Sequence, residues 1–341
     1  MKDFHTYREI LTQADAWQDA LDTTEKNRRD LERVSEGGYE QVIFTGCGST
    51  YYLSLAAAAL FQEMTGRVAR AVPAGELFLN PKVSLTHGKT LLVSVSRSGS
   101  TTETVRAVEQ FKKENHGPVI GITNYGDQPL ASLADVPLVI EKGQEISVAQ
   151  TRSFASMYVA AVTLTSIFAQ RDDLAKSLKR LPSLAQAIIE RYEQHAKGLG
   201  EDLSRDRYYF LGSGMRYGLA CEVNLKMKEM TLTHSEPFHF LEFRHGPMSM
   251  VTDQATVIGL LSNSNRSHEV KVLDEMAQLG GHTFSLGEKN ADVSFESGLD
   301  ESVMGVLYLP VLQLMAYYRS VKKGLNPDHP TNLTAVVKLS I

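Results

Sequence analysis

Cysteine is scarce in this sequence: Cys47 and Cys221 are the only two among 341 residues. Two thiols provide no disulfide framework of the kind that stabilises small secreted domains. Stability must come instead from a buried core, and 341 residues are enough for two domains of ordinary size. We therefore expect a cytoplasmic protein, in which burial is the usual fate of a lone thiol.

Long apolar runs and a basic charge excess are also missing. The longest runs, such as Ser54–Phe61, are far too short to cross a bilayer, and the N-terminus MKDFHTYREI has no apolar signal core. The formal net charge is −5 and the pI is near 6.1. This balance argues against general binding to nucleic acid or to anionic membranes, so recognition of any anion must be local.

The stretch Leu91–Val105, LLVSVSRSGSTTETV, joins an apolar run to the start of a helix through a loop of hydroxyls and glycine. The apolar half predicts a buried strand. The helix leaves its first N–H groups unpaired, and its dipole favours negative charge there. One N-cap needs one hydroxyl, whereas this loop carries several. We therefore predict an anion site, with hydrogen bonds from Ser96, Ser98 and Thr101 and a charged guanidinium at Arg97.

Strand-like runs alternate with helical patterns through the first half of the chain. The expected strands are Glu40–Phe44, Val68–Pro73, Leu91–Val95, Val119–Thr123 and Val136–Ile140. This alternation predicts an α/β fold, a doubly wound parallel sheet with helices on both faces. Ligands in such sheets lie beyond the carboxyl ends of the strands, where the loops rich in small residues are expected.

The second half of the sequence repeats the first at a constant offset of 166 residues. The offset carries Phe44, Gly46, Gly48, Tyr51, Thr90, Ser96, Ser98 and Glu103 onto the identical residues Phe210, Gly212, Gly214, Tyr217, Thr256, Ser262, Ser264 and Glu269. Eight identities without a gap predict a duplicated α/β unit. We expect an N-terminal helical segment at 1–38, a first domain at 39–190 and a second at 191–341.

The two copies differ at the anion loop. In the second copy Asn265 replaces Gly99 and Ser267 replaces Thr101. The glycine that lets the backbone approach an anion is therefore missing. We expect the first copy to bind the anion.

The second copy instead carries a cluster of charged and imidazole side chains. If Leu219–Leu232 is a helix, Lys226 and Glu229 share a face and Glu222 stands four residues before Lys226. A solvated ladder of salt bridges commonly has this spacing. Further polar residues follow in a segment that Pro237 and the Gly246-Pro247 pair keep from forming a regular helix: His234, Glu236, His239, Glu242, Arg244 and His245.

The histidines of this segment raise the question of a metal site. His239, Glu242 and His245 are spaced three and three, which matches no helical zinc pattern. A carboxylate and an imidazole without metal are a common set for proton transfer. We therefore expect neither a metal nor a cofactor.

These residues resemble the SIS (sugar isomerase) family of phosphosugar-binding proteins, and most closely the tandem isomerase half of glucosamine-6-phosphate synthase. The resemblance runs from about Tyr39 to the C-terminus. It rests on five stretches: GCGSTYYLSLAAA at Gly46, SRSGSTTET at Ser96, EISVAQTRSF at Glu145, LKMKEMTLTHSE at Leu225 and EFRHGP at Glu242. It implies two SIS domains, each an α-β-α sandwich. The first strand already begins near Glu40, so no amidotransferase half is expected and the chain should not be a glutamine-dependent synthase.

The resemblance also implies roles for individual residues. Glu229 is implied as the acid/base that moves a proton between C1 and C2 of a sugar, with Lys226 beside it. His245 is implied as the ring-opening group, and in the family it reaches the site of the neighbouring subunit, so a homodimer is implied. The implied substrate-binding residues are Thr50, Ser96, Arg97, Ser98, Thr101 and Gln150.

Three positions depart from the synthase pattern. Arg97 stands where the synthase has glutamine, and Gln150 stands where it has serine. Ala335 occupies the position of a C-terminal lysine, with Lys338 three residues later. Alanine cannot form a Schiff base with a keto sugar, whereas isomerisation through an enediol needs only a base and ring opening.

The resemblance leaves several functions open. The first is an aldose–ketose isomerase acting on a 6-phosphorylated sugar or amino sugar. A deaminase of an amino sugar phosphate or a sugar–amine deglycase would use the same residues, and Arg97 could also select a sulfonate on C6. A sugar-phosphate sensor without chemistry is the alternative from another class, but such regulators usually carry a helix-turn-helix domain, for which 1–38 is too short.

Overall fold

The computed structural model of the chain describes residues 4–86, 88–114, 116–336 and 339. Contacts between residues divide the chain into two units, each built on one five-stranded sheet. The β1–β5 unit comprises Thr12–Glu145, Gln150–Pro182 and Thr334–Ile341, and the β6–β10 unit comprises Met1–Leu11, Ile146–Ala149 and Ser183–Leu333.

The β1–β5 sheet has the strand order β2-β1-β3-β4-β5, and every neighbouring pair is parallel. Its strands are β1 (Gln41–Gly46), β2 (Ala69–Pro73), β3 (Thr90–Ser96), β4 (Val119–Thr123) and β5 (Val136–Val139). Every residue of β1, β3 and β4 is buried, as expected for strands covered on both faces. The expected parallel, doubly wound sheet is therefore confirmed.

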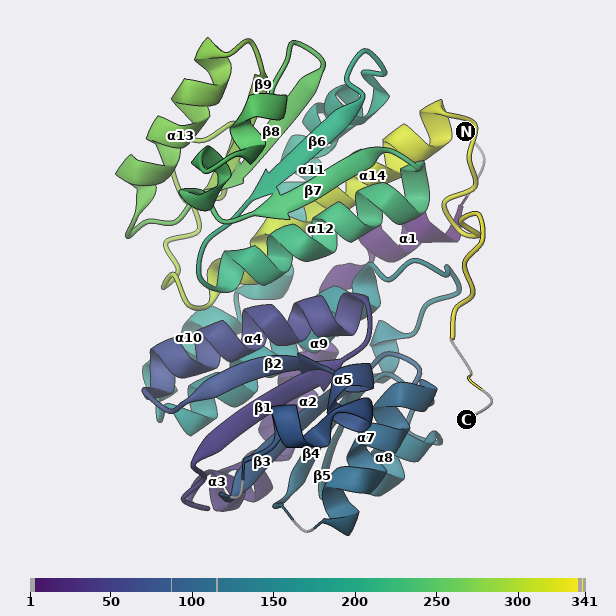
Figure 1. Ribbon diagram of the computed structural model, residues 1–341, viewed down its shortest axis with the longest axis vertical. Helices are drawn as coiled ribbons and strands as arrows, with labels where there is room; N and C mark the ends of the chain where they lie inside the picture. The colour runs from purple at the N-terminus through teal and green to yellow at the C-terminus, as the bar shows by residue number, and fades with distance from the viewer. Residues whose placement is uncertain (1–3, 87, 115, 337–338, 340–341) are drawn as a thin grey trace. The chain divides into compact units, whose positions relative to one another are not determined.

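Helices cover both faces of this sheet (Figure 1). One face carries α2 (Gln13–Lys26), α4 (Ser49–Thr65) and α9 (Arg152–Phe168), and nearly all of α9 is buried. The other face carries α5 (Ala74–Leu79), α7 (Thr102–Lys113) and α8 (Pro129–Leu133), which enclose a core that includes Leu92 and Phe111. The remaining helical segments of this unit are α3 (Arg28–Ser35), α6 (Pro81–Ser84), η1 (Glu141–Gly143), η2 (Asp172–Leu174) and α10 (Ala175–Leu178).

The β6–β10 sheet is also parallel, in the order β10-β9-β8-β6-β7. Its strands are β6 (Arg207–Leu211), β7 (His234–Phe238), β8 (Ala255–Leu260), β9 (His282–Gly287) and β10 (Val293–Ser294). Its helical segments are α1 (His5–Leu11), most of α11 (Leu181–Glu201), α12 (Met215–Thr231), α13 (Arg266–Gln278), α14 (Leu309–Lys322), η3 (Glu242–Arg244), η4 (Pro247–Met250) and η5 (Met304–Tyr308).

The repeat seen in the sequence is present in the fold. Numbered from its own first strand, each sheet has the order 2-1-3-4-5. The offset of 166 residues carries the bounds of α4 onto those of α12. The caps agree as well, since Gly48 has φ 56° and ψ −123° and Gly214 has φ 58° and ψ −133°.

The structure contains an edge strand that the sequence analysis did not predict, and it does not test the expected domain limits. The segment that begins at His234 is not irregular from its start, because His234–Phe238 forms the edge strand β7; Pro237 is tolerated in an edge strand. By their contacts, α1 belongs to the β6–β10 unit and α2 to the β1–β5 unit, and the chain passes between the units at Pro182 and Ser183. The domain limits at 38/39 and 190/191 stay predictions.

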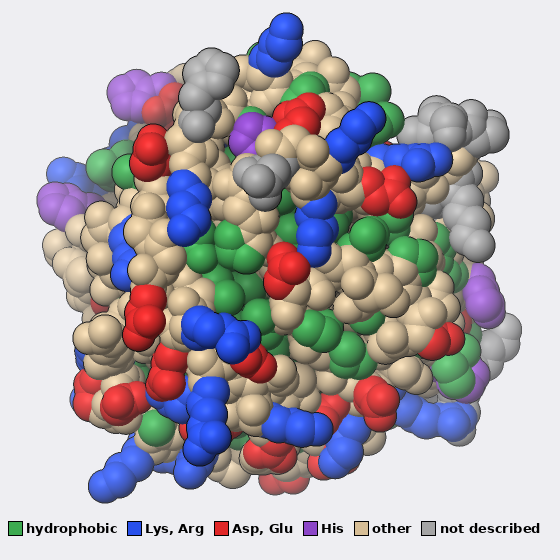
Figure 2. Space-filling view, turned by 90° about the horizontal axis from the view of Figure 1, so that it is seen from below, with side chains coloured by type: hydrophobic (Ala, Val, Ile, Leu, Met, Phe, Trp, Pro, Cys, Tyr) green, Lys and Arg blue, Asp and Glu red, His purple; other side chains and the backbone are tan. Residues whose placement is uncertain are grey.

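None of the helices in the described part of the chain is both long and apolar enough to cross a membrane. Figure 2 shows one face of the molecule, where basic and acidic side chains are interspersed and small apolar areas lie between them. Neither sign of charge dominates that face.

The strand-to-helix turns of both repeats require a glycine, and this gives a stability prediction. A Cβ on Gly46 would lie 2.7 Å from the backbone carbon of Thr50, and one on Gly212 would lie 2.3 Å from the Arg216 carbonyl oxygen. We expect Gly46→Ala and Gly212→Ala each to lower the free energy of unfolding by about 1–3 kcal/mol, because the backbone has to shift. Urea denaturation followed by circular dichroism measures this.

Gly75→Ala and Gly198→Ala are matched controls for this prediction. Both glycines lie in helices, and an added Cβ would meet nothing within 4 Å. These controls should be neutral or up to about 1 kcal/mol more stable, since alanine is the better helix former. If Gly46→Ala and Gly212→Ala have the same free energy of unfolding as the controls, the steric argument is wrong.

Candidate active site

The loop between β3 and α7 is shaped by Gly99. This residue has φ 65°, a left-handed conformation that glycine adopts without strain. A Cβ there would lie 2.9 Å from the Gln128 Cβ and 3.0 Å from the Thr123 Oγ1, so a side chain is also excluded by space. The chain can therefore turn tightly from Ser96 at the end of β3 to Thr101, the N-cap of α7.

The hydroxyls of this loop converge. The Thr101 Oγ1 lies 3.3 Å from the Ser96 Oγ and 3.5 Å from the Ser98 Oγ. The backbone N–H of Gly99 donates to the Ser96 Oγ at 3.2 Å, and that of Ser100 donates to the Ser98 Oγ at 3.2 Å. Ser98 and Thr101 are partly exposed. Neutral donors gathered at a helix N-terminus, without a carboxylate among them, form an arrangement suited to an anion.

Arg97 is directed to partners within the β1–β5 unit. Its side chain is only 7% exposed, and its Nη1 lies 3.8 Å from the Glu145 Oε2. Its Nη2 donates a hydrogen bond of 2.8 Å to the backbone carbonyl of Ala335. Arg97 thus lies beside the hydroxyl loop, as expected, but its guanidinium holds a buried carboxylate and the C-terminal segment.

Glu145 begins one of the five stretches that carry the family resemblance, but the sequence analysis gave it no role. Its side chain is fully buried and accepts hydrogen bonds from the Thr151 N–H (2.8 Å), the Thr151 hydroxyl (2.7 Å) and the Ser153 hydroxyl. It therefore ties the start of α9 to Arg97 of the hydroxyl loop. The available signal was an acidic residue six positions before the Thr-Arg-Ser start of a helix.

Thr50 and Gln150 each lie at the start of a helix in the same unit. Thr50 is buried in the first turn of α4, where its Oγ1 accepts from the Cys47 N–H and donates to the Cys47 carbonyl, both at 2.9 Å. Gln150 directly precedes Thr151, the N-cap of α9. Its Oε1 is buried and has no hydrogen-bond partner among the described residues, so it is available to a hydroxyl donor.

Neither cysteine has the surroundings of a nucleophile. Burial raises the pKa of the Cys47 thiol, and the Cys47 Sγ lies 3.6 Å from the Thr104 Oγ1. Burial raises the pKa of Cys221 to about 12. Both thiols are therefore protonated and unreactive near neutral pH.

The equivalent loop of the β6–β10 unit is filled from within. The Ser262 N–H and hydroxyl both donate to the Glu269 Oε2, at 2.6 and 2.9 Å, and the Asn263 N–H donates to the Glu301 Oε1 at 3.0 Å. Arg216, at the position equivalent to Thr50, pairs with Glu301. The protein's own carboxylates thus occupy the place that an external anion would take.

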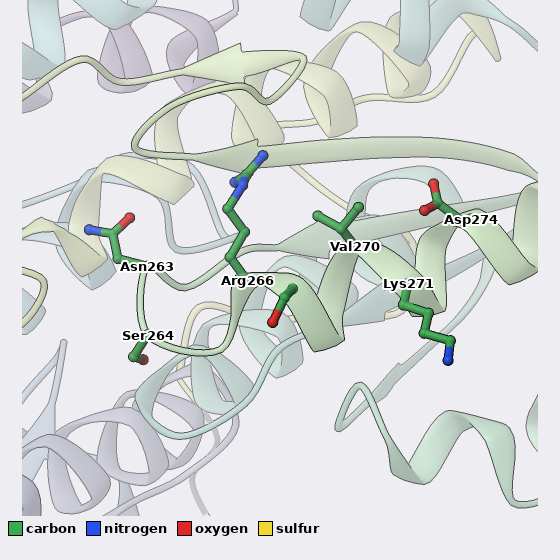
Figure 3. Close-up of a pocket in the computed structure, with 7 residues that line it drawn as sticks. Asn263, Ser264, Arg266, Val270, Lys271 and Asp274 are labelled. Atoms are coloured by element: carbon green, nitrogen blue, oxygen red, sulfur yellow. The ribbon is translucent and has the colours of Figure 1, made fainter.

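A hollow of about 530 Å³ lies beside this filled loop (Figure 3). It is lined by side chains of both charges at the start of α13, and those labelled are Asn263, Ser264, Arg266, Val270, Lys271 and Asp274. Its charged lining consists of two basic side chains and one acidic side chain, and the carboxylates of Glu269 and Glu301 hold the adjacent loop.

The second group of expected site residues lies on α12, in the β6–β10 unit. The Lys226 Nζ lies 2.5 Å from the Glu229 Oε2 and 3.4 Å from the Glu222 Oε1. The side chains of Lys226 and Glu222 are each 1% exposed, whereas that of Glu229 is 19% exposed. A solvated ladder is thus excluded: a buried ammonium joins one buried carboxylate to a second carboxylate that reaches the surface.

The polar segment after α12 is not gathered into one cluster. The His239 ring stacks on Tyr217 with centroids 3.9 Å apart, and Arg244 pairs with Glu275 of α13. His245 is exposed, and its side chain forms no hydrogen bond or ion pair with any described residue. Within the described ranges, no three His, Cys, Asp or Glu side chains are arranged to hold a metal ion. Lys338 lies outside the described residues.

Comparison with known proteins relates these two groups of residues to a family. The SIS domain family matches residues 39–167 and 203–295. A glutamine–fructose-6-phosphate aminotransferase (isomerizing) from Thermococcus kodakarensis is 28% identical over 349 residues, which is 97% of this chain and 57% of the relative. The enzyme of the same name from Sulfolobus acidocaldarius is 32% identical over 253 residues, 72% of this chain and 42% of the relative. The chain spans about half the length of these curated relatives.

Solved structures share the fold over nearly the whole chain. A glucosamine-6-phosphate deaminase from Thermotoga maritima is 27% identical with a TM-score of 0.82, covering 98% of this chain and 100% of that one. A tagatose-6-phosphate ketose/aldose isomerase from Escherichia coli is 24% identical with a TM-score of 0.86, covering 97% of both chains, and shows the shared fold only. Because the family matches both repeats and more than half of the residues, this chain belongs to the SIS domain family.

Proposed function

We propose that this protein is an aldose–ketose isomerase acting on a 6-phosphorylated sugar or amino sugar. The observation that carries the proposal is the Lys226–Glu229 pair, in which a buried ammonium lies 2.5 Å from a carboxylate that is still 19% exposed. A carboxylate in this position can act as a general base. Partial exposure leaves that base within reach of a substrate.

The phosphate of the substrate is assigned to the β3–α7 loop. The converging hydroxyls of Ser96, Ser98 and Thr101 and the start of α7 supply its donors. Arg97 contributes a positive charge beside the loop, and Thr50 and Gln150 lie at helix starts in the same unit. Support for this assignment comes from the equivalent loop, where carboxylates fill the same place.

The proposed chemistry is a proton transfer between neighbouring carbons. Glu229 removes the proton from C2 of the open-chain aldose and later returns it at C1, while a proton moves from the C2 hydroxyl to the C1 oxygen; the aldose thereby passes through an enediol(ate) to the ketose. Lys226 stabilises the negative charge of the carboxylate before the transfer. The imidazole of His245 moves a proton between the anomeric hydroxyl and the ring oxygen, which opens the ring. Ala335 offers no amine, so no imine with the enzyme is part of this route.

A deaminase is the second candidate, favoured by the likeness to the Thermotoga maritima deaminase across the whole chain. With an amino group on C2, the same proton shift gives a ketimine at C2. Water then adds to that carbon and ammonia leaves, which yields the ketose. The two activities share residues and differ in substrate.

A substrate panel with a Glu229→Gln variant tests the function. The parent protein is incubated with 6-phosphosugars, amino sugar 6-phosphates and sulfoquinovose, and ketose and ammonia are measured. On the accepted substrate, Glu229→Gln should lower kcat by about 100-fold or more with little change in affinity, because shape is kept and the base is lost. Glu236→Gln on β7 serves as the control and should keep parental kcat. A Glu229→Gln variant with normal turnover would reject the mechanism.

The anion loop is tested with inorganic phosphate and isothermal titration calorimetry. Ser98→Ala and Thr101→Val each remove one neutral donor, so we expect each to weaken binding by about 0.5–1.5 kcal/mol, roughly 2- to 10-fold. The matched controls are Ser264→Ala and Ser267→Ala, the equivalent positions in the β6–β10 unit, and these should leave the affinity unchanged. Equal losses in both repeats would show that the β3–α7 loop is not the specific site.

A homodimer is proposed as the active form, with His245 serving the site of the neighbouring subunit. Glu229→Gln and His245→Ala are each expected to be inactive alone. Mixed dimers should regain about one active site in two, since one of their sites then receives both intact residues. Activity after subunit exchange, with tagged hybrids isolated, measures this. Inactive hybrids would place both residues in the site of one chain.

A further inference from the structure

The C-terminal segment Thr334–Val336 is attached to the β3–α7 loop of its own unit, and Leu339 makes a second contact beside that loop. The Arg97 Nη2 donates to the Ala335 carbonyl at 2.8 Å, and the Leu339 N–H donates to the Thr102 Oγ1 at 3.1 Å. Thr102 is the first residue of α7, directly after the hydroxyl loop. The chain therefore returns to the loop close to where an anion would bind.

Within the described residues, this segment buries little side-chain surface. Thr334 and Ala335 are exposed, so neither contributes much apolar burial. Segments with few buried apolar contacts depend on individual hydrogen bonds for their position. The hydrogen bond from Arg97 to Ala335 is the stronger of the two that attach this part of the chain, because its donor carries a full charge.

Arg97 is itself fixed by a buried carboxylate. Its Nη1 faces Glu145, whose side chain is fully buried and receives hydrogen bonds from Thr151 and Ser153 at the start of α9. The guanidinium therefore joins two groups through two different nitrogens: a carboxylate on one side and a backbone carbonyl on the other. The planar guanidinium has donors in several fixed directions, whereas a lysine ammonium is a single point of charge.

We propose that Arg97 is a positioning residue that holds the C-terminal segment against the anion loop, with the Ala335 carbonyl rather than the bound anion as the main partner of its guanidinium. Glu145 sets the orientation of Arg97. The segment in turn shields the loop from water and narrows the range of anions that fit. The kinetic part of this inference rests on the proposed function, and the mobility part does not.

The variant Arg97→Lys distinguishes a role in holding the C-terminal segment from a role in binding the anion. Lysine keeps the positive charge but lacks the several fixed donor directions of the guanidinium. Thr334→Cys, placed in a Cys47→Ser background, carries a nitroxide spin label, and electron paramagnetic resonance measures its mobility. We expect a restrained label in the parent and a mobile label in Arg97→Lys. The affinity for inorganic phosphate should change by less than about threefold in Arg97→Lys, because the charge beside the loop is retained.

Ser98→Ala is the control with the opposite pattern, since it should weaken phosphate binding and leave the label restrained. Glu145→Gln should mobilise the label as Arg97→Lys does, because the orienting charge is gone. A label that stays restrained in Arg97→Lys overturns the proposal. So does an Arg97→Lys variant whose phosphate affinity falls tenfold or more while the label stays restrained, which would make Arg97 an anion ligand.

A truncated chain that ends at Leu333 provides the kinetic arm. Truncation and Arg97→Lys should each raise KM on the accepted substrate by the same factor, and the double variant should show no further rise, because both act through one segment. Additive effects on KM overturn the proposal. If no sugar phosphate is turned over at all, the proposed function fails, while the label and phosphate measurements still decide the role of Arg97.

Discussion

Each turn from a parallel strand into a helix carries backbone N–H groups that neither the strand nor the helix satisfies, and the equivalent β3–α7 and β8–α13 turns satisfy them in different ways. In the β1–β5 unit the hydroxyls of Ser96 and Ser98 accept from the loop amides. In the β6–β10 unit the loop amides and the Ser262 hydroxyl donate to the carboxylates of Glu269 and Glu301. The two equivalent turns therefore differ: Gly99 has φ 65° and Asn265 has φ −114°, and one loop is lined by neutral hydroxyls whereas the amides of the other are held by the chain's own carboxylates. Divergence of the repeats has left one of them suited to an external anion.

The buried charges follow a second constraint, since an ion removed from water needs a counter-charge and hydrogen bonds. Lys226 lies between Glu222 and Glu229, and Arg97 lies beside Glu145. Replacement of such a pair by apolar residues often costs little stability, so stability alone does not explain why it is retained. Lys226 lies next to Glu229, the proposed base, and Arg97 lies next to the hydroxyl loop that is proposed to bind the anion.

The sequence predicted the fold well, because the signals are local and repeated. Apolar runs bounded by small residues located β1 to β5, and the offset of 166 residues predicted a second unit of the same fold. The edge strand β7 was missed, since its side chains alternate only weakly and it contains Pro237. Most strand and helix positions follow from the spacing of apolar residues, which can be read from a single sequence.

The site was predictable only in part. The local grouping of Lys226, Glu229 and Glu222 on one helix was predicted, but the partners of Arg97 were not, because these lie far away in sequence. Glu145 and Arg97 are 48 positions apart in the sequence (145 − 97 = 48), and the spacing of apolar and polar residues does not predict a contact at that distance. Identical residues at equivalent positions of the two repeats do not make the same interactions either. Glu269 accepts from Ser262, whereas the equivalent Glu103 has a buried Oε2 without a partner among the described residues.

The sequence presents Arg97 and Ala335 as two separate departures from the synthase pattern, and the structure joins them in one hydrogen bond. Ala335 contributes a backbone carbonyl and no amine. Arg97 contributes a charge that cannot be given up, because a guanidinium stays protonated in proteins and so serves neither as a base nor as an amine nucleophile. The positive charge beside the anion loop is therefore restricted to binding and positioning. Under the proposed function, the proton transfer then has to rest on Glu229, whose carboxylate lies 2.5 Å from the buried ammonium of Lys226.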